Sequence, residues 1–330
     1  MHVVVTGACG FLGSHVTEAL LARGDSVVGV DDFNAFYDPN IKEGHRALLE
    51  AAAGDVKIVR GSVLDAATLG EAFARRPDVV VHLAAWAGVR PSIQMPRLYQ
   101  RENIEGTVSV LEHMRAAGGP LPRLVFASSS SVYGGNLKVP FHEDDAVNEP
   151  VSPYAATKRC CELLLHTWGH IWGLFSTSLR LFTVYGPRQR PEMAIHKFAK
   201  LLVEGRPVPR YGDGSTARDY TYVDDIVRGV LAAVDRNTGP RSRIYNLGNA
   251  RTIRLDQLIE QLAAALQVEA RFEAMPEQPG DVSLTCADIA RARAELGFDP
   301  RTPIETGLQQ FASWFLVQGA LASASTKPDR

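Results

Sequence analysis

The sequence predicts an α/β protein with a Rossmann-like, doubly wound parallel sheet and a smaller C-terminal α/β substrate domain. Short apolar segments suited to buried parallel strands alternate with helical patterns along the first half of the chain. A glycine-rich segment follows the first apolar segment, and an acidic residue follows the second. At 330 residues, the chain is long enough for one large domain or two modest ones.

The first strand is expected at residues 3–5, and the segment after it carries Gly7, Gly10 and Gly13. A helical pattern then runs to Gly24. Glycines at this point allow a tight turn, close approach of the backbone to a diphosphate and close packing of helix on strand. The start of the helix offers N–H groups to the same anion. These residues therefore predict a dinucleotide site.

The second strand, residues 26–30, ends at Asp31. This acid lies about 20 residues beyond the glycine segment, where a carboxylate can bind both hydroxyls of a ribose. Its charge would repel a 2′-phosphate, and no Arg follows it directly. The predicted cofactor is therefore NAD and not NADP.

The next strands are expected at residues 56–59, 79–83 and 124–127. Ligands bind at the carboxyl ends of the strands in a doubly wound sheet. Segments 61–65 and 83–87 lie at two such ends, and their small residues leave room for a cofactor.

Tyr154 and Lys158 are four residues apart on a helix expected to begin after Ser152 and Pro153, so their side chains share one face. A phenol has a reference pKa near ~10, and a base at neutral pH needs a pKa about 3 units lower, or about 4 kcal/mol. A fixed ammonium one turn away supplies part of that change, and a bound cationic nicotinamide ring supplies more. This pair is the candidate catalytic centre, supported by the hydroxyl run from Ser128 to Ser131 just upstream.

Beyond residues 179–187 the composition changes, and five arginines appear among Pro and Gly: Arg188, Arg190, Arg206, Arg210 and Arg218. They are either surface charges or cations lining a pocket for a small diphosphate ligand. Further strands are expected at residues 220–223 and 244–247. Helices are expected at residues 255–266, 291–296 and 308–316, with a frayed tail from Ser323.

Composition limits the function classes. The formal net charge of −2 argues against a nucleic-acid partner. The start of the chain does not resemble a signal peptide, and no apolar run approaches the ~20 residues of a membrane helix. The four cysteines form no Cys-x-x-Cys pair, so we expect a soluble, cytoplasmic protein in a reduced setting. His166 and His170 have the spacing of a metal pair but no suitably spaced third ligand, so no metal is expected.

Together these motifs resemble the extended short-chain dehydrogenase/reductase family, and within it the NAD-dependent nucleotide-sugar epimerases and dehydratases. The resemblance runs from Val3 to about Leu316. It rests on the glycine segment with Phe11 and Leu12, on residues 128–134, on Tyr154 and Lys158, and on residues 218–225 and 245–249. Residues 32–39, 87–90, 182–194 and 278–282 resemble one branch of this family, the UDP-glucuronate 4-epimerases.

The resemblance implies an NAD-binding domain of residues 1–181, to which residues 213–249 return, and a UDP-sugar-binding domain of residues 182–212 and 250–330. The NAD contacts that it implies are Gly7, Gly10, Phe11, Leu12, Gly13, Asp31, Asn34, Lys42, Ser62, Val63, Leu83, Ala84, Ala85, Ala87, Asn103, Ser128, Tyr154 and Lys158. The substrate contacts are Arg90, Ser129, Ser130, Ser131, Tyr154, Thr183, Arg190, Arg218 and Asp281. Two residues depart from the family pattern: Trp86 replaces a smaller polar residue, and Ser62 replaces an Asp that contacts the adenine.

The implied activity is that of an isomerase, a UDP-glucuronate 4-epimerase that forms UDP-galacturonate through a 4-keto sugar without decarboxylation. Tyr154 would take the proton of the 4-hydroxyl, Lys158 would hold the nicotinamide ribose, and Ser129 would bridge the sugar hydroxyl and the phenol. A homodimer through paired helices is expected from the resemblance; by itself, the sequence around Asn103 and Leu111 fits packing on either a neighbouring helix or a second subunit.

Alternative activities differ at the serine run. Dehydratases of the family carry an Asp-Glu pair just before the Val-Tyr-Gly, and decarboxylases carry a Glu. Ser130 and Ser131 stand there in this chain, and hydroxyls are not general acids near neutral pH. A 4-epimerase of another UDP-sugar (UDP-glucose, UDP-N-acetylglucosamine or UDP-arabinose) is the nearest alternative. A catalytically silent NAD-binding sensor belongs to a different class and disagrees with the retention of Ser129, Tyr154 and Lys158.

Overall fold

A computed structural model of the chain describes residues 1–276 and 284–325. The chain divides into two compact units. Unit 1 consists of Met1–Leu181, Val227–Leu247 and Asp288–Phe298, and unit 2 consists of Phe182–Ile226, Gly248–Ala287 and Asp299–Arg330. The segment that returns to unit 1 is therefore shorter than the expected residues 213–249, and a second short segment also returns.

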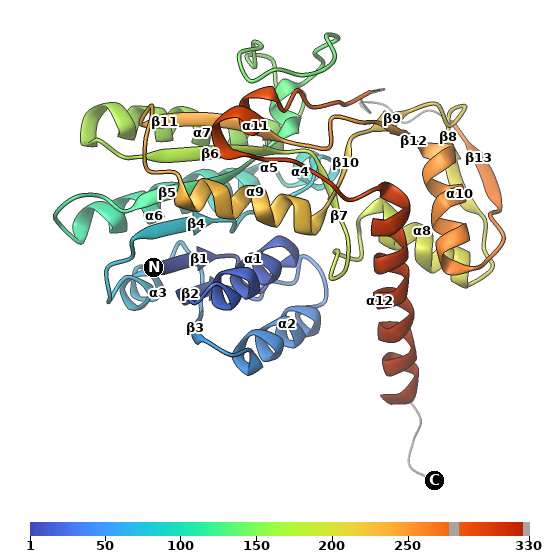
Figure 1. Cartoon of the computed structure of the whole chain (residues 1–330), viewed down its shortest axis with the longest axis horizontal. Helices are drawn as coiled ribbons and strands as arrows, with labels where there is room; N and C mark the ends of the chain where they lie inside the picture. Colours follow the sequence, from blue (N-terminus) through green and yellow to red (C-terminus); the bar gives the residue numbers. More distant parts are fainter. Residues whose placement is uncertain (277–283, 326–330) are drawn as a thin grey trace. The chain divides into compact units, whose positions relative to one another are not determined.

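Unit 1 contains a seven-stranded parallel sheet with the order β11-β6-β5-β4-β1-β2-β3 (Figure 1). The direction of strand succession reverses between β1 and β4, which is the point where Rossmann folds bind dinucleotides. The predicted doubly wound parallel sheet is thus confirmed. Its strands are β1 (His2–Thr6), β2 (Ser26–Asp31), β3 (Asp55–Arg60), β4 (Val79–His82), β5 (Arg123–Ser129), β6 (Ser176–Leu181) and β11 (Ser242–Leu247).

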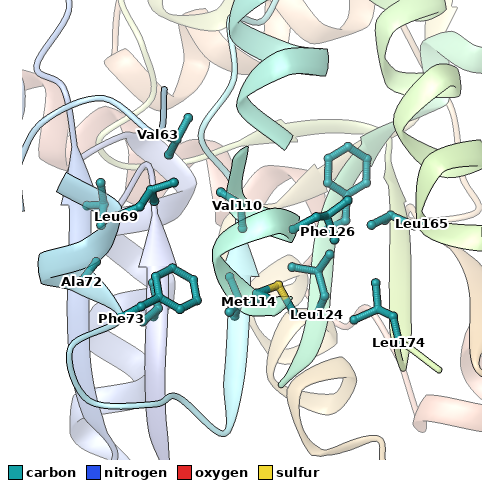
Figure 2. Packing of buried hydrophobic residues seen from close by; sticks show 14 of the residues in the cluster. Val63, Leu69, Ala72, Phe73, Val110, Met114, Leu124, Phe126, Leu165 and Leu174 are labelled. Atoms are coloured by element: carbon teal, nitrogen blue, oxygen red, sulfur yellow. The ribbon is translucent and has the colours of Figure 1, made fainter. Parts of the chain in front are cut away.

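Helices cover both faces of this sheet. On one face, α3 (Ala66–Ala72), α6 (Gly106–Ala116) and α7 (Pro153–Trp172) enclose a hydrophobic core against the strands (Figure 2). Phe73, Met114 and Leu165 come from three different helical regions and belong to one buried cluster with Leu124 and Phe126 of β5. Figure 1 shows α1 (Phe11–Ala22) and α9 (Val223–Asp235) in front of the strands, and α2 (Pro39–Ala51) packs against α1.

Five short helical elements complete the described part of unit 1. They are α4 (Val89–Gln94), α5 (Pro96–Tyr99), the π-helix η1 (Gln100–Glu105), the 3₁₀-helix η2 (Ser130–Tyr133) and α11 (Ala290–Leu296). The start of α7 follows its sequence signals: Ser152 is the N-cap and accepts a hydrogen bond from the Ala155 N–H at 3.1 Å, and Pro153 occupies the first turn. The last residue of the helix is Trp172, and its C-cap is Gly173, whose φ of 72° favours glycine.

Unit 2 is built from short two-stranded sheets and three longer helices. Its elements are β7 (Thr183–Tyr185), α8 (Ala194–Val203), β8 (Val208–Tyr211), β9 (Ala217–Arg218), β10 (Tyr220–Tyr222), β12 (Ile253–Arg254), α10 (Leu255–Leu266), β13 (Phe272–Met275) and α12 (Ile304–Ser325). Strand β10 pairs with β7, β12 with β9, and β13 with β8. Residues 213–222 therefore belong to unit 2 and not to the NAD-binding domain expected from the sequence.

Most element boundaries differ by one or more residues from the sequence-based expectation, and two of the differences change the type of structure. Val223, expected at the end of a strand, is the first residue of α9. Helix α12 begins earlier than expected and continues to Ser325, so the tail predicted from Ser323 is helical over its first residues. Among the described residues, no helix is both long enough and apolar enough to cross a membrane.

Candidate active site

The glycine segment forms a tight cradle at the carboxyl end of β1. Gly7 has φ 71°, and a Cβ there would lie 2.8 Å from the Ala84 nitrogen. A Cβ on Gly13 would lie 1.9 Å from the Gly7 carbonyl oxygen, far inside van der Waals contact. Only glycine fits these positions. Gly10 is the N-cap of α1 and has no side chain to bond the first N–H groups of that helix, which favours an anion there.

Asp31 lies at the end of β2 and is buried. Its carboxylate accepts hydrogen bonds from the backbone N–H groups of Cys9 at 3.0 Å and Phe33 at 2.9 Å, and Lys42 Nζ lies 3.5 Å away. Burial raises the pKa of Asp31, and the Lys42 ammonium opposes that rise. Since each carboxylate oxygen accepts more than one hydrogen bond, capacity remains for ribose hydroxyls.

The segment after β4 is held by hydrogen bonds on both sides. The Leu83 and Ala84 N–H groups donate to the carbonyl and hydroxyl oxygens of Thr6 at 3.1 and 3.2 Å. Asn103 accepts from the Trp86 N–H at 2.7 Å and donates to the Trp86 carbonyl at 3.0 Å. The side chain of Asn103, an expected NAD contact, thus fixes the chain that carries Ala84, Ala85 and Ala87.

The candidate catalytic pair lies in the first two turns of α7. Lys158 is buried, and its Nζ donates to the Ala127 carbonyl at 2.7 Å. This Nζ lies 6.0 Å from the ring centroid of the half-buried Tyr154. Burial lowers the pKa of Lys158 to about 8, while the negative charge of Glu162 raises it. Lys158 is therefore largely protonated at neutral pH and places a positive charge beside the phenol.

The ring of Tyr99 supports the ring of Tyr154. The two rings pack edge to face with centroids 6.2 Å apart. Tyr99 is fully buried, and its hydroxyl donates to the Ala87 carbonyl at 2.7 Å. On its other side, the Tyr99 ring packs against Trp86 at 6.3 Å. Sequence reasoning did not identify Tyr99, because no local pattern indicates contact between residues 55 positions apart.

The serine run has three different environments. Ser129 is the N-cap of η2: its Oγ accepts from the Ser131 N–H and donates to the Ser131 Oγ, both at 3.1 Å. Ser130 and Ser131 are half-buried in η2. Helix α7 packs against both β5 and η2, so Ser129 and Tyr154 belong to one region. Ser128, an expected NAD contact, donates its hydroxyl proton to Glu162 at 2.6 Å, so this hydroxyl is available to a cofactor only as an acceptor.

Glu162 belongs to a buried ionic network that the sequence did not reveal. Arg180 of β6 donates to both carboxylate oxygens of Glu162 at 2.9 Å, and Arg159 adds a third contact at 3.1 Å. The Arg180 guanidinium also lies 4.8 Å from the Tyr133 ring centroid. Burial opposes the charge of Arg180, but Glu162 raises its pKa above the ordinary value. The network ties α7 to the ends of β5 and β6.

His82 forms a second buried network at the end of β4. Its Nδ1 lies 2.7 Å from the Thr6 hydroxyl, and its Nε2 lies 3.1 Å from the Thr107 hydroxyl. The Thr107 hydroxyl donates to the Asn103 carbonyl at 2.6 Å, so it accepts from His82. His82 is therefore the neutral tautomer protonated at Nε2. Burial, with a smaller contribution from the Lys158 charge, lowers the pKa of His82 to about 3.

The side chains of three other expected NAD contacts make contacts within the protein. Asn34 Oδ1 accepts from the Phe36 N–H at 3.1 Å, and Ser62 Oγ accepts from the Leu64 N–H at 3.1 Å. The side chain of Val63 is buried in the core of Figure 2, so a contact from Val63 would come from its backbone.

The expected substrate contacts are spread over both units. In unit 1, Arg90 is exposed on α4. In unit 2, the Thr183 N–H donates to the Asp219 carbonyl at 3.1 Å, and Arg190 Nε lies 2.8 Å from Glu192. Arg218 donates to the Ala217 carbonyl at 3.0 Å. Asp281 lies outside the described residues. In the part of the chain that the structure describes, no group of three His, Cys, Asp or Glu side chains is arranged to hold a metal ion.

Asp219 organises the turn that follows β11. Its buried carboxylate accepts hydrogen bonds from the N–H groups of Asn249 at 2.6 Å, Ala250 at 3.1 Å and Ala287 at 3.0 Å. These three hydrogen bonds explain why an acidic residue follows Arg218. They also join Asp219 to Asn249, so the motifs at residues 218–225 and 245–249 contact each other in the folded chain.

The chain is similar to known proteins over most of its length. The model of the NAD dependent epimerase/dehydratase family matches residues 3–248. UDP-glucuronate 4-epimerase 3 of Arabidopsis thaliana is 45% identical, over 95% of this chain and 76% of the relative. The crystal structure of UDP-glucuronic acid 4-epimerase from Bacillus cereus with UDP-glucuronic acid and NAD is 33% identical, with a TM-score of 0.90, over 96% of this chain and 100% of that one.

A UDP-glucose 4-epimerase from Thermotoga maritima, solved with UDP-glucose, is also similar. It is 30% identical, with a TM-score of 0.86, over 96% of this chain and 99% of that one. The fold is therefore common to sugar epimerases with different substrates, while the identity is higher to the plant UDP-glucuronate enzyme.

Proposed function

Because this chain belongs to the NAD dependent epimerase/dehydratase family, we infer that it is an isomerase that converts UDP-glucuronate to UDP-galacturonate by NAD-dependent 4-epimerisation. The observation that carries this conclusion is the 45% identity to a UDP-glucuronate 4-epimerase over 95% of the chain. The site residues agree with it: the chain carries Ser129, Tyr154 and Lys158 on adjacent elements of unit 1.

The residues of unit 1 fit NAD. The cradle of Gly7 and Gly13 admits no side chain, and the start of α1 favours a diphosphate. The Asp31 carboxylate suits two ribose hydroxyls. When bound, NAD supplies reversible acceptance of a hydride from C4 of the sugar. We propose the NAD contacts named from the sequence, with Asn103 acting through its effect on neighbouring backbone and Ser128 acting as a hydrogen-bond acceptor.

In the proposed mechanism, Tyr154 removes the proton of the 4-hydroxyl while C4 loses its hydride. Lys158 lowers the cost of the phenolate by its nearby positive charge. Ser129 bridges the sugar hydroxyl and the phenol. The resulting 4-keto sugar turns its other face before the hydride returns, and Tyr154 gives the proton back, which completes an inversion at C4 with no net oxidation.

The carboxylate of the substrate needs separate control, because a carboxylate β to a ketone can leave as CO2. Loss of CO2 requires the C–C bond to lie perpendicular to the carbonyl plane. We propose that Ser129, Ser130, Ser131 and Thr183 donate to the carboxylate and hold it in another orientation, with Arg190 or Arg90 near the sugar or its charge. Arg218 would bind the diphosphate, and Asp281 the uridine ribose.

The assembly and location that we propose are a cytoplasmic homodimer. Leu163 and Ile171 of α7 are apolar, 52% and 56% exposed, and two turns apart on the helix, which suits a helix-to-helix interface between two copies. Leu163→Glu should shift the molar mass measured by light scattering from that of a dimer to that of a monomer. A monomeric parent protein would contradict the proposed dimer without affecting the proposed reaction.

The proposed function is tested by incubating the purified protein with UDP-glucuronate and no added NAD. We expect UDP-galacturonate to form, with less than stoichiometric UDP-pentose, and Tyr154→Phe to form neither. Parallel reactions contain UDP-glucose, UDP-N-acetylglucosamine or UDP-arabinose. Turnover of a neutral sugar alongside no reaction of UDP-glucuronate would replace the proposed substrate with that sugar.

A further inference from the structure

Two aromatic residues from different strand ends meet in unit 1. Phe36 lies between β2 and α2, and Trp86 lies between β4 and α4. Their rings pack edge to face with centroids 5.1 Å apart and an interplanar angle of 69°. Both side chains are half-buried, so each also has a solvent-facing part.

The position of this contact follows from the strand order. In the sheet, β1 lies between β4 and β2. A contact between the segment that follows β4 and the segment that follows β2 therefore spans the carboxyl end of β1. That end carries the glycine cradle of Gly7, and it is the switch point where a dinucleotide crosses the sheet.

The two sides of the contact are held differently. Trp86 is fixed through its N–H and carbonyl by Asn103, at 2.7 and 3.0 Å, and its ring also packs on Tyr99. On the other side, the Asn34 side chain accepts from the Phe36 N–H at 3.1 Å, and the Asn34 N–H donates to Asp32 at 3.1 Å. These bonds join residues within five positions of one another, whereas the bonds and ring contact of Trp86 join different elements of unit 1.

We propose that Phe36 and Trp86 form an aromatic clasp that closes over the NAD site and slows dissociation of the cofactor, with Asn103 holding the Trp86 half in place. The proposal rests on the proposed function, because an epimerase regenerates its NAD in every cycle and gains from keeping it bound. Edge-to-face aromatic pairs contribute about 0.5–1.5 kcal/mol beyond burial, which converts to about 2- to 13-fold in a rate.

The test is a double-mutant cycle on cofactor retention. Trp86→Ala, Phe36→Ala and the double variant are purified with the parent protein, and the rate of NAD release is measured after transfer to NAD-free buffer with a trapping dehydrogenase. We expect each single variant to release NAD about 10-fold faster than the parent. We expect the double variant to be no faster than the faster single variant, because each substitution already removes the same contact.

Controls separate a clasp from other causes. Trp314→Ala removes a half-buried tryptophan of unit 2 and should leave the release rate unchanged. Trp86→Phe keeps an aromatic ring and should restore slow release, and circular dichroism of each variant establishes that it is folded. Release rates within 2-fold of the parent for both single variants would overturn the clasp, as would effects that multiply in the double variant. A folded parent protein that binds no NAD would instead overturn the proposed function itself.

Discussion

Lys158 Nζ donates a hydrogen bond of 2.7 Å to the Ala127 carbonyl, which ties the helix that carries Tyr154 to the strand that ends at Ser129. This bond holds the buried ammonium 6.0 Å from the centroid of the Tyr154 ring. The two side chains start one helical turn apart on α7, so the helix backbone helps to keep the charge beside the phenol.

The first prediction concerns Tyr154. Tyr154→Phe removes the only group proposed to take the proton of the 4-hydroxyl, so turnover of UDP-glucuronate should fall by about 10²–10⁴-fold. The ring contact with Tyr99 does not involve the hydroxyl, and so the melting temperature should stay close to that of the parent. Product formation is followed by separation of the two UDP-sugars. Turnover above a tenth of the parental rate would reject Tyr154 as the base.

The second prediction concerns decarboxylation. Replacing Ser130 and Ser131 together by Ala removes two half-buried donors proposed for the substrate carboxylate. The double variant should raise the fraction of UDP-pentose in the product or raise the KM for UDP-glucuronate. A neutral UDP-sugar, if accepted, serves as the matched control because it has no carboxylate to hold. An unchanged product ratio together with an unchanged KM speaks against the carboxylate role.

The third prediction concerns acid stability. In the folded protein the pKa of His82 is about 3, and in the unfolded chain it is near 6.5. Below pH 6.5 the unfolded state therefore binds a proton that the folded state does not. His82 alone should lower the free energy of unfolding by about 1.4 kcal/mol for each pH unit between 6.5 and 3, and not at all above 6.5.

Urea unfolding at several pH values measures this slope. His82→Gln should flatten the dependence between pH 6.5 and 4, whereas His166→Gln, a change at an exposed histidine of α7, should not. A parental slope that His82→Gln leaves intact would show that other groups cause the acid sensitivity.

The fourth prediction concerns the buried ion pair. Arg180→Met leaves the Glu162 carboxylate buried, with Ser128 as a neutral donor and the half-buried Arg159 as its remaining cation, so the free energy of unfolding should fall by about 3–5 kcal/mol. Adding Glu162→Leu removes the remaining charge and should recover much of that loss. Thermal and urea unfolding of the single and double variants give the comparison. If Arg180→Met and the double variant are equally stable, the buried charge of Glu162 is not the cause of the destabilisation.

The sequence predicted the parts of the site that depend on neighbours along the chain. The glycine cradle, Asp31 at a strand end and the Tyr154–Lys158 spacing each occupy one short segment, where turn geometry and helical periodicity act directly. The sequence did not reveal His82, Tyr99 or Glu162 as supports of the site. His82 bonds residues 76 and 25 positions away, Glu162 accepts from a residue 34 positions away, and the Tyr99 ring packs on Tyr154. Only the folded protein brings those partners together.

The folded sheet also explains why Ser128 and Ser129 have different surroundings. Ser128 and Ser129 are adjacent in β5, so their side chains point to opposite faces of the sheet. Ser129 reaches η2 and Ser128 reaches Glu162, although both belong to the same motif. The start of α9 at Val223 was not predicted because a β-branched residue is typical of a strand, whereas here it begins a helix.

Unit 1 takes its seventh strand and α11 from residues 242–247 and 290–296, whereas its first six strands are complete by Leu181. During synthesis on the ribosome, β6 is therefore left as an open sheet edge until more than sixty further residues have been added. The nascent protein exposes an aggregation-prone edge for that interval, and a gene truncated after residue 181 would leave it exposed permanently.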